Sequence, residues 1–335
     1  MNSREDPGPA TSRTRGPLSW GARGAGSAVA VGIGVAMAVQ ARINGELGRR
    51  IDDGLVAALL SFLGGLVLLV VLAGTVPQLR TGLRRVVAAV RDRRLRPYQL
   101  LGGVFGAFLV ACQGLTVAVV GVAVFTVAVV AGQAASGLLV DRAGVGPAGP
   151  QAVTARRVIG AVLALVAVVL AVSDRLGAPR SLWLVVLPAL AGVGIAWQQA
   201  VNGRVGAAGR GAGHPVAGML SAAVVNFAVG MLALGLIAAV DVGIRGLPGP
   251  LPAQPWLYVG GLLGVLVIGG AAAVVPITGV LLLGLGTVAG QLVGALLLDL
   301  FAPAGDGQLT TRTVIGTALT LLAVVVTALP TRRRT

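Results

Sequence analysis

The chain has 335 residues, of which 56% are hydrophobic and 11% are charged, whereas a soluble domain carries about 25% charged residues. All 26 basic residues are arginine, which excludes the phosphate loop of nucleotide-driven pumps and the Schiff base of pyridoxal enzymes, since both need lysine. One cysteine and one histidine exclude an internal disulfide and a usual zinc site, and we expect no metal and no cofactor.

The net charge of +15 would indicate a nucleic-acid partner in a soluble protein. The arginines, however, gather in short clusters between long uncharged intervals, a pattern typical of a chain that crosses a bilayer many times. We therefore expect the lipid bilayer as partner and no nucleic acid.

In chain order, the first segment is 1–23, which is rich in Pro, Gly, Ser and Arg and is expected to be a disordered basic tail. The uncharged intervals that follow are 24–41, 54–79, 97–140, 158–173, 181–203, 211–240, 246–298 and 313–331. A helix needs about 20 residues to cross the hydrocarbon, so the two longest intervals must each hold two helices. The sequence thus predicts an all-α integral membrane protein with ten transmembrane helices.

The arginines also predict the orientation of these helices. If the amino terminus is inside, 19 arginines lie on the inner side and seven on the outer side, as positively charged inner loops require. We expect both termini in the cytoplasm, a basic cytoplasmic tail at 331–335, and a multi-pass protein of the inner membrane.

The sequence contains an internal duplication with a shift of 158 residues, which becomes 165 between the first two helices of each copy. The matched positions are Gln40 with Gln198, Asn44 with Asn202, Ser61-Phe62 with Asn226-Phe227, Gly65 with Gly230, Gly102 with Gly260, Gly106 with Gly264, Gln133 with Gln291, and Asp141 with Asp299. The predicted repeats are 24–175 and 181–330. Because each holds five helices, the second enters the membrane from the opposite side, which is the inverted architecture of alternating-access transporters.

These motifs resemble the YdcZ-like group of the drug/metabolite transporter superfamily. The resemblance is carried by Gln-x-x-x-Asn-Gly after a small-residue helix, Ser/Asn-Phe-x-x-Gly in the next helix, and Gly-Gln followed by Asp in the fourth helix, each present twice. It implies a ten-helix transporter fold made of two fused five-helix copies.

Four amides are candidate residues of the substrate pathway. Gln40 and Asn44 share one helical face, as do Gln198 and Asn202, because they are four residues apart. An unpaired amide is costly in hydrocarbon, so these side chains should point inward. Two interpretations stay open: the amides bind a polar solute, or they hold neighbouring helices together.

Further candidates lie in the fourth and ninth helices and their neighbours. Gln133 and Gln291 are expected either to line the pathway or, more in keeping with buried amides, to bridge helices. Gln113 has an apolar counterpart, so it would make the pocket unequal between the halves. Asp141 and Asp299 are candidates for gating or coupling, and the alternative is that each anchors a helix end.

The leading functional hypothesis is a secondary transporter that moves a small organic solute, a metabolite or drug-like molecule, by alternating access. The alternative is a membrane scaffold or assembly protein that keeps the fold and transports nothing. An enzyme is not expected, because paired acids, a metal cluster and a nucleophile with its base are all lacking. The cargo, its direction, the coupling ion and the oligomeric state, with a homodimer among the alternatives, stay open.

Overall fold

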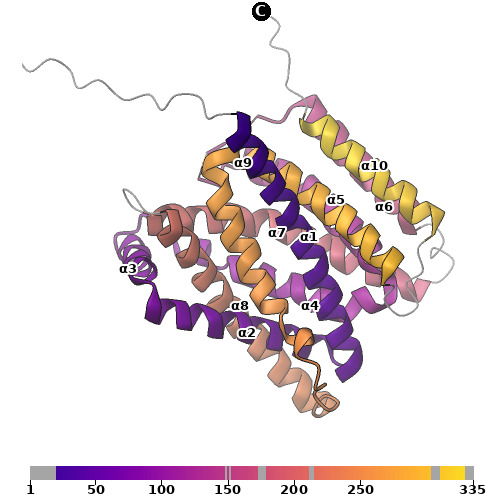
Figure 1. The fold of residues 1–335 in the computed structure, drawn as a ribbon, viewed down its shortest axis with the longest axis horizontal. Helices are drawn as coiled ribbons and strands as arrows, with labels where there is room; N and C mark the ends of the chain where they lie inside the picture. Colours follow the sequence, from indigo (N-terminus) through magenta and orange to yellow (C-terminus); the bar gives the residue numbers. More distant parts are fainter. Residues whose placement is uncertain are drawn as a thin grey trace, which may run out of the picture.

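A computed structural model of the chain describes residues 20–147, 149–150, 152–172, 179–210, 215–302 and 310–328. Every regular element within these ranges is a helix, and the helices pack into one bundle (Figure 1). The predicted tail 331–335 and most of the predicted tail 1–23 lie outside the described residues, and the first helix begins at Trp20.

The described part of the first half is built in chain order from α1 (Trp20–Ile51), α2 (Gly54–Thr75), α3 (Pro77–Arg91), the short turn η1 (Pro97–Leu100), α4 (Gly102–Val120), α5 (Val122–Arg142) and α6 (Ala155–Val172). The described part of the second half contains α7 (Pro179–Arg210), α8 (Pro215–Arg245), the turn η3 (Pro255–Tyr258), α9 (Gly260–Phe301) and α10 (Thr311–Ala328).

Local chemistry explains where several of these helices begin and end. Asp53 caps α2, since its Oδ1 accepts hydrogen bonds from the backbone N–H groups of Leu55 at 2.9 Å and Val56 at 3.0 Å. Pro77 occupies the first turn of α3, where its missing N–H removes no helical hydrogen bond. Gly121 separates α4 from α5 with a φ of 82°, a backbone conformation that glycine adopts without a steric cost.

Six described helical stretches are long and apolar enough to cross a membrane: 28–51, 54–75, 97–120, 122–142, 184–210 and 215–245. Four shorter apolar stretches lie at 157–167, 260–271, 286–301 and 311–326. The chain is therefore an all-helical, multi-pass membrane protein, and the prediction that the interval 97–140 holds two helices is confirmed by α4 and α5.

The other long interval holds α9, whose backbone is helical over 42 residues but reverses direction. Its first arm runs antiparallel to α1, because Gly260 lies against Asn44 and Gly264 against Gln40. Its second arm runs parallel to α1, because Gly290 lies against Val31 and the Ala302 carbonyl accepts a hydrogen bond from Arg42 Nε at 3.2 Å. The reversal falls between residues 271 and 287, so α9 consists of two antiparallel arms (Figure 1).

Helices of each copy pack against helices of the other copy, and the two sets of contacts are related by a pseudo-two-fold axis. A Cβ atom on Gly34 of α1 would clash with the Thr287 carbonyl of α9, and a Cβ on Gly192 of α7 would clash with the Val129 carbonyl of α5. A shift of 158 residues turns the first contact into the second. Each first helix is thus pressed against the fourth helix of the other copy.

A second exchanged contact lies closer to the axis. A Cβ on Gly103 would clash with the Asn226 carbonyl, and a Cβ on Gly261 would clash with the Ser61 carbonyl. Backbone contact of this kind needs glycine at both positions, because any side chain would separate the helices. The copies are therefore interleaved across the bundle rather than folded as separate lobes.

The fifth helix of each copy lies outside this interleaved centre. α6 and α10 pack side by side along one edge of the molecule (Figure 1). They meet through small side chains, with Ala164 and Ala323 buried together next to Ala131 of α5. These two helices are again equivalent by sequence, so the pseudo-two-fold axis passes between them.

One helix, α3, has no separate counterpart among the described residues of the second half. α3 is amphipathic, and its buried positions Leu79, Gly82, Val86 and Ala89 recur at helical spacing. They pack against α8 and α7, where a Cβ on Gly82 would lie 2.6 Å from the Ala217 carbonyl. In the second copy, α8 is one continuous helix of 31 residues.

Candidate functional site

The first-half amides form a cluster between α1, α4 and α9. Asn44 Nδ2 donates a hydrogen bond of 2.7 Å to Gln113 Oε1, and both side chains are buried. Gln40 lies one turn away on α1, and its Nε2 is 3.0 Å from the position that a Cβ on Gly264 would take. Asn44 and Gln113, predicted as separate pathway residues, therefore contact each other directly.

The second-half amides form the equivalent cluster between α7, α8 and α4. Asn226 Oδ1 accepts a hydrogen bond from Gln198 Nε2 at 2.9 Å and another from Asn202 Nδ2 at 3.0 Å. Gln198 Nε2 lies 2.7 Å from the position of a Cβ on Gly106. The glycines that the sequence analysis matched thus provide the space in which these amides lie.

An aromatic pair separates the two amide clusters. The ring centroids of Phe62 on α2 and Phe227 on α8 are 4.9 Å apart, a distance typical of a favourable aromatic contact. The Phe227 ring also lies against Gly65 of α2, and the Phe62 ring lies against Gly230 of α8. Because Phe62 and Phe227 are equivalent positions, the pseudo-two-fold axis runs between their rings.

Each cluster holds one buried acceptor that no described group satisfies. These atoms are Asn44 Oδ1 in the first cluster and Gln198 Oε1 in the second. A buried acceptor without a donor costs about 1–3 kcal/mol. Both atoms are therefore suited to accept hydrogen bonds from a solute that carries N–H or O–H groups.

The other two predicted pathway amides do not join the clusters. Gln133 Nε2 donates to Gln199 Oε1 at 3.2 Å, and this pair is exposed. Gln291 is buried in the second arm of α9, at the close contact between that arm and Gly34 of α1. Both residues lie where helices of different copies meet, as the bridging alternative expects.

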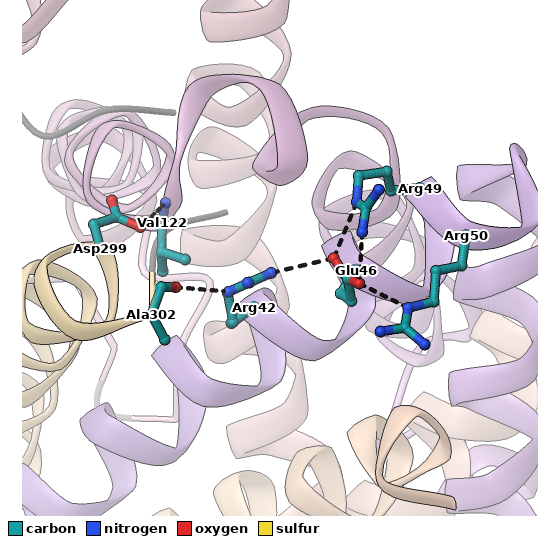
Figure 2. A network of polar contacts seen from close by, with 7 residues as sticks. All are labelled: Arg42, Glu46, Arg49, Arg50, Val122, Asp299 and Ala302. Carbon is teal, nitrogen blue, oxygen red and sulfur yellow. Dashed lines mark hydrogen bonds and ion pairs between the residues drawn. The ribbon is translucent and has the colours of Figure 1, made fainter. Parts of the chain in front are cut away.

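Asp299 holds the junction between α4 and α5. Its Oδ1 accepts from the Val122 N–H at 2.9 Å (Figure 2). Its Oδ2 accepts from the Ala123 N–H at 2.7 Å. These two N–H groups open α5 just after the break at Gly121 and would otherwise have no acceptor in the helix. A carboxylate at a helix N-terminus is also favoured by the helix dipole. Asp299, at 5% exposure, therefore fastens the end of α9 to the start of α5.

Asp141, the equivalent carboxylate, makes a different contact. It forms an ion pair with Arg157 of α6, and the pair is partly exposed to solvent. The equivalent of the Gly121 junction lies in α9, at the reversal between residues 271 and 287.

The structure shows a cluster of charged side chains beside Asp299 that was not predicted from the sequence. Buried Glu46 pairs with Arg49 at 2.8 Å, with Arg50 at 2.7 Å and with Arg42 at 3.6 Å (Figure 2). The spacing of three and four residues on one helix could have indicated these pairs. Arg42 also donates to the Ala302 carbonyl, so the cluster ties the end of α1 to the end of α9.

Asn226 connects two helices of the second cluster, and its replacement tests this role. We expect Asn226→Ala to lower the free energy of unfolding in detergent by about 1–2 kcal/mol, because two amide donors lose their acceptor. Asn226→Ser, which introduces the residue found at the equivalent Ser61, is the matched control and should lose less. Wild-type stability of the alanine variant would contradict the bridging role.

The comparison with known families agrees with the internal repeat. The family model described as "Putative inner membrane exporter, YdcZ" matches the chain twice, over residues 25–170 and 183–326. A search of curated proteins finds no match. The two matches confirm two fused copies. They also support a multi-pass transporter of the inner membrane. Membership of an exporter family implies a protein that is not an enzyme. The chain belongs to the YdcZ family of the drug/metabolite transporters.

Proposed function

We propose that this protein is a secondary transporter that exports a small organic solute by alternating access, with the two copies inserted in opposite directions as ten transmembrane helices. The observation that carries the proposal is the exchanged packing of the two copies. Gly34 of α1 is pressed against Thr287 of α9, and the equivalent Gly192 of α7 against Val129 of α5, so the copies are interleaved about a pseudo-two-fold axis.

An inverted pair of repeats has two conformations of equal architecture, in which each copy takes the state of the other. In the exchanged state, the junction at Gly121 and the reversal of α9 exchange their conformations, and Asp299 leaves the start of α5. The carboxylates then act as two latches at opposite ends of the protein. Their alternate engagement opens one side of the membrane while the other is closed.

The two amide clusters are the proposed contacts of the solute. Their unsatisfied acceptors, Asn44 Oδ1 and Gln198 Oε1, favour a solute with at least one hydrogen-bond donor. The ring pair of Phe62 and Phe227 adds an apolar surface between the clusters. A small amphiphilic molecule with donor groups fits this combination of polar and aromatic contacts.

Transport is measured on vesicles that contain the purified protein, screened against classes of small amphiphilic solutes with protein-free vesicles as reference. We expect one class to move, and Gln40→Ala/Gln198→Ala to slow it about tenfold or more, because one amide is lost from each cluster. The matched control is Gln133→Ala, which removes a half-buried amide outside both clusters and should leave the rate within about twofold.

A membrane scaffold is the alternative that these measurements address. It predicts that the folded wild-type protein moves no solute class, and this result would replace the transporter by the scaffold. A double variant that transports as fast as the wild type would show instead that Gln40 and Gln198 do not contact the solute.

A further inference from the structure

The amphipathic helix α3 and the turn after it carry a cluster of arginines that the transport mechanism does not use. Seven arginines lie between 80 and 96, with Asp92 as the one acidic residue in that range. Two of the arginines have described partners: Arg94 pairs with Asp92 at 2.6 Å, and Arg85 donates to the Arg210 carbonyl at 3.0 Å.

Four of the remaining arginines, Arg80, Arg84, Arg91 and Arg93, form what we call the α3 basic face. They are exposed, and no acidic side chain lies within ion-pair distance of them among the described residues. Arg80, Arg84 and Arg91 share one side of the helix through their spacing of four and seven residues. This uncompensated positive charge is suited to a polyanionic or phosphate-bearing partner.

The packing of α3 holds this face in a fixed position. The opposite side of the helix is buried against α7 and α8, where Val86 packs with Val205 and Ala222. Gly82 is pressed against the Ala217 backbone. The basic face is therefore part of the rigid bundle, which reduces the entropy lost when a ligand binds.

Two cavities open along the basic face. One, of about 440 Å³, is lined by Arg91, Arg93 and Arg96 together with Val90, Leu95 and Pro97. The other, of about 550 Å³, is lined by Arg84, Arg91 and Asp92 together with Leu83, Val87 and Ala88. Arg91 contributes to both, so the cavities are neighbours, and each combines guanidinium groups with aliphatic side chains.

The surroundings place this face at the level of a membrane surface. α2 exposes Val67, Val70 and Val71 on the side that would face lipid, and it ends at Thr75 immediately before α3. Tyr98, after α3, is half-exposed and lies with its ring centroid 6.1 Å from that of Trp197. Aromatic side chains of this kind are enriched where hydrocarbon meets headgroups.

We propose that the α3 basic face binds the phosphate headgroup of an anionic phospholipid, with the aliphatic side chains of the two cavities contacting its acyl chains. A free phosphate would use the arginines but not Leu83, Val87 and Val90. The second copy has no helix at the equivalent place, because α8 ends at Arg245 and residues 246–254 are not helical. The proposed lipid site therefore lies in one leaflet of the bilayer and is not repeated in the other.

The experiment measures lipid binding to the detergent-solubilised full-length protein by native mass spectrometry, with phosphatidylglycerol and phosphatidylcholine titrated separately. We expect selective binding of phosphatidylglycerol, weakened on the order of 100-fold in Arg84→Gln/Arg91→Gln/Arg93→Gln. Arg84→Lys/Arg91→Lys/Arg93→Lys keeps the charge and should retain most of the binding. Circular dichroism confirms that each variant is folded.

The control Arg332→Gln/Arg333→Gln/Arg334→Gln removes the same charge from the carboxyl-terminal segment and should bind as the wild type does. Three results would overturn the proposal. They are equal binding of the two lipids, an equal loss in the tail control, and displacement of the lipid by glycerol 3-phosphate at comparable concentration, which would identify a site for soluble phosphate.

Discussion

Replacing Asp299 with alanine is expected to lower the free energy of unfolding by about 2 kcal/mol, because the N–H groups of Val122 and Ala123 lose a charged acceptor in a buried place. The same change weakens one of the two proposed latches. A shift of about 1.4 kcal/mol changes the ratio of two conformations about tenfold. Unfolding is followed by thermal denaturation in detergent, and transport in vesicles.

Asp141→Ala is the matched control, because it removes the equivalent carboxylate from the other copy. Its partly exposed ion pair with Arg157 should contribute at most about 1 kcal/mol to stability. Transport should nevertheless fall about as far as in the Asp299 variant, since Asp141 is needed in the exchanged conformation. If Asp141→Ala transported at the wild-type rate, the latch exchange would be wrong and Asp299 would act only as a helix cap.

A methyl group on Gly34 is expected to be among the most damaging small changes in the protein. The new Cβ would clash with the Thr287 carbonyl and lie 2.6 Å from the Gln291 nitrogen, so it meets backbone atoms that cannot turn away. We expect Gly34→Ala to lower the free energy of unfolding by about 3 kcal/mol, the upper end of overpacking costs. The measurement is the loss of stability in detergent.

Gly32, two residues earlier on α1, supplies the control for that variant. Its position is exposed and no described heavy atom lies within 4 Å of a Cβ placed there. Gly32→Ala should be neutral or stabilise α1 by up to about 1 kcal/mol, because alanine favours helix more than glycine does. Equal losses in the two variants would show that the effect does not come from the contact between Gly34 and α9.

The variants at Gly34 and Asp299 test two kinds of contact in the same fold, a backbone packing contact and a helix cap. The glycine contact keeps α1 against the second arm of α9 and is repeated by Gly192 against Val129 in the other copy. Asp299 caps α5, and Asp141 in the other copy binds Arg157. The glycine variant therefore tests how the two copies pack, and the carboxylate variants test how the ends of α9 and α5 are held.

The sequence by itself determined the membrane class, the duplication and the positions that correspond between the copies. These follow from quantities that are local or periodic: uncharged intervals long enough to cross hydrocarbon, and a shift that matches rare polar residues and glycines. The inward direction of Asn44 and Gln198 was predictable for the same reason, because an amide in lipid is costly whatever the fold.

Only the tertiary structure decided which of these residues meet. Asn44 with Gln113 and Asp299 with α5 are contacts between helices far apart in the chain, and Asn226 with Gln198 joins the consecutive helices α8 and α7. Helix pairing and rotation depend on the close packing of many side chains at once, which a one-dimensional pattern does not contain. The contact of Asp299 with the start of α5 has the same origin, because the helix that this carboxylate caps lies 177 residues away along the chain.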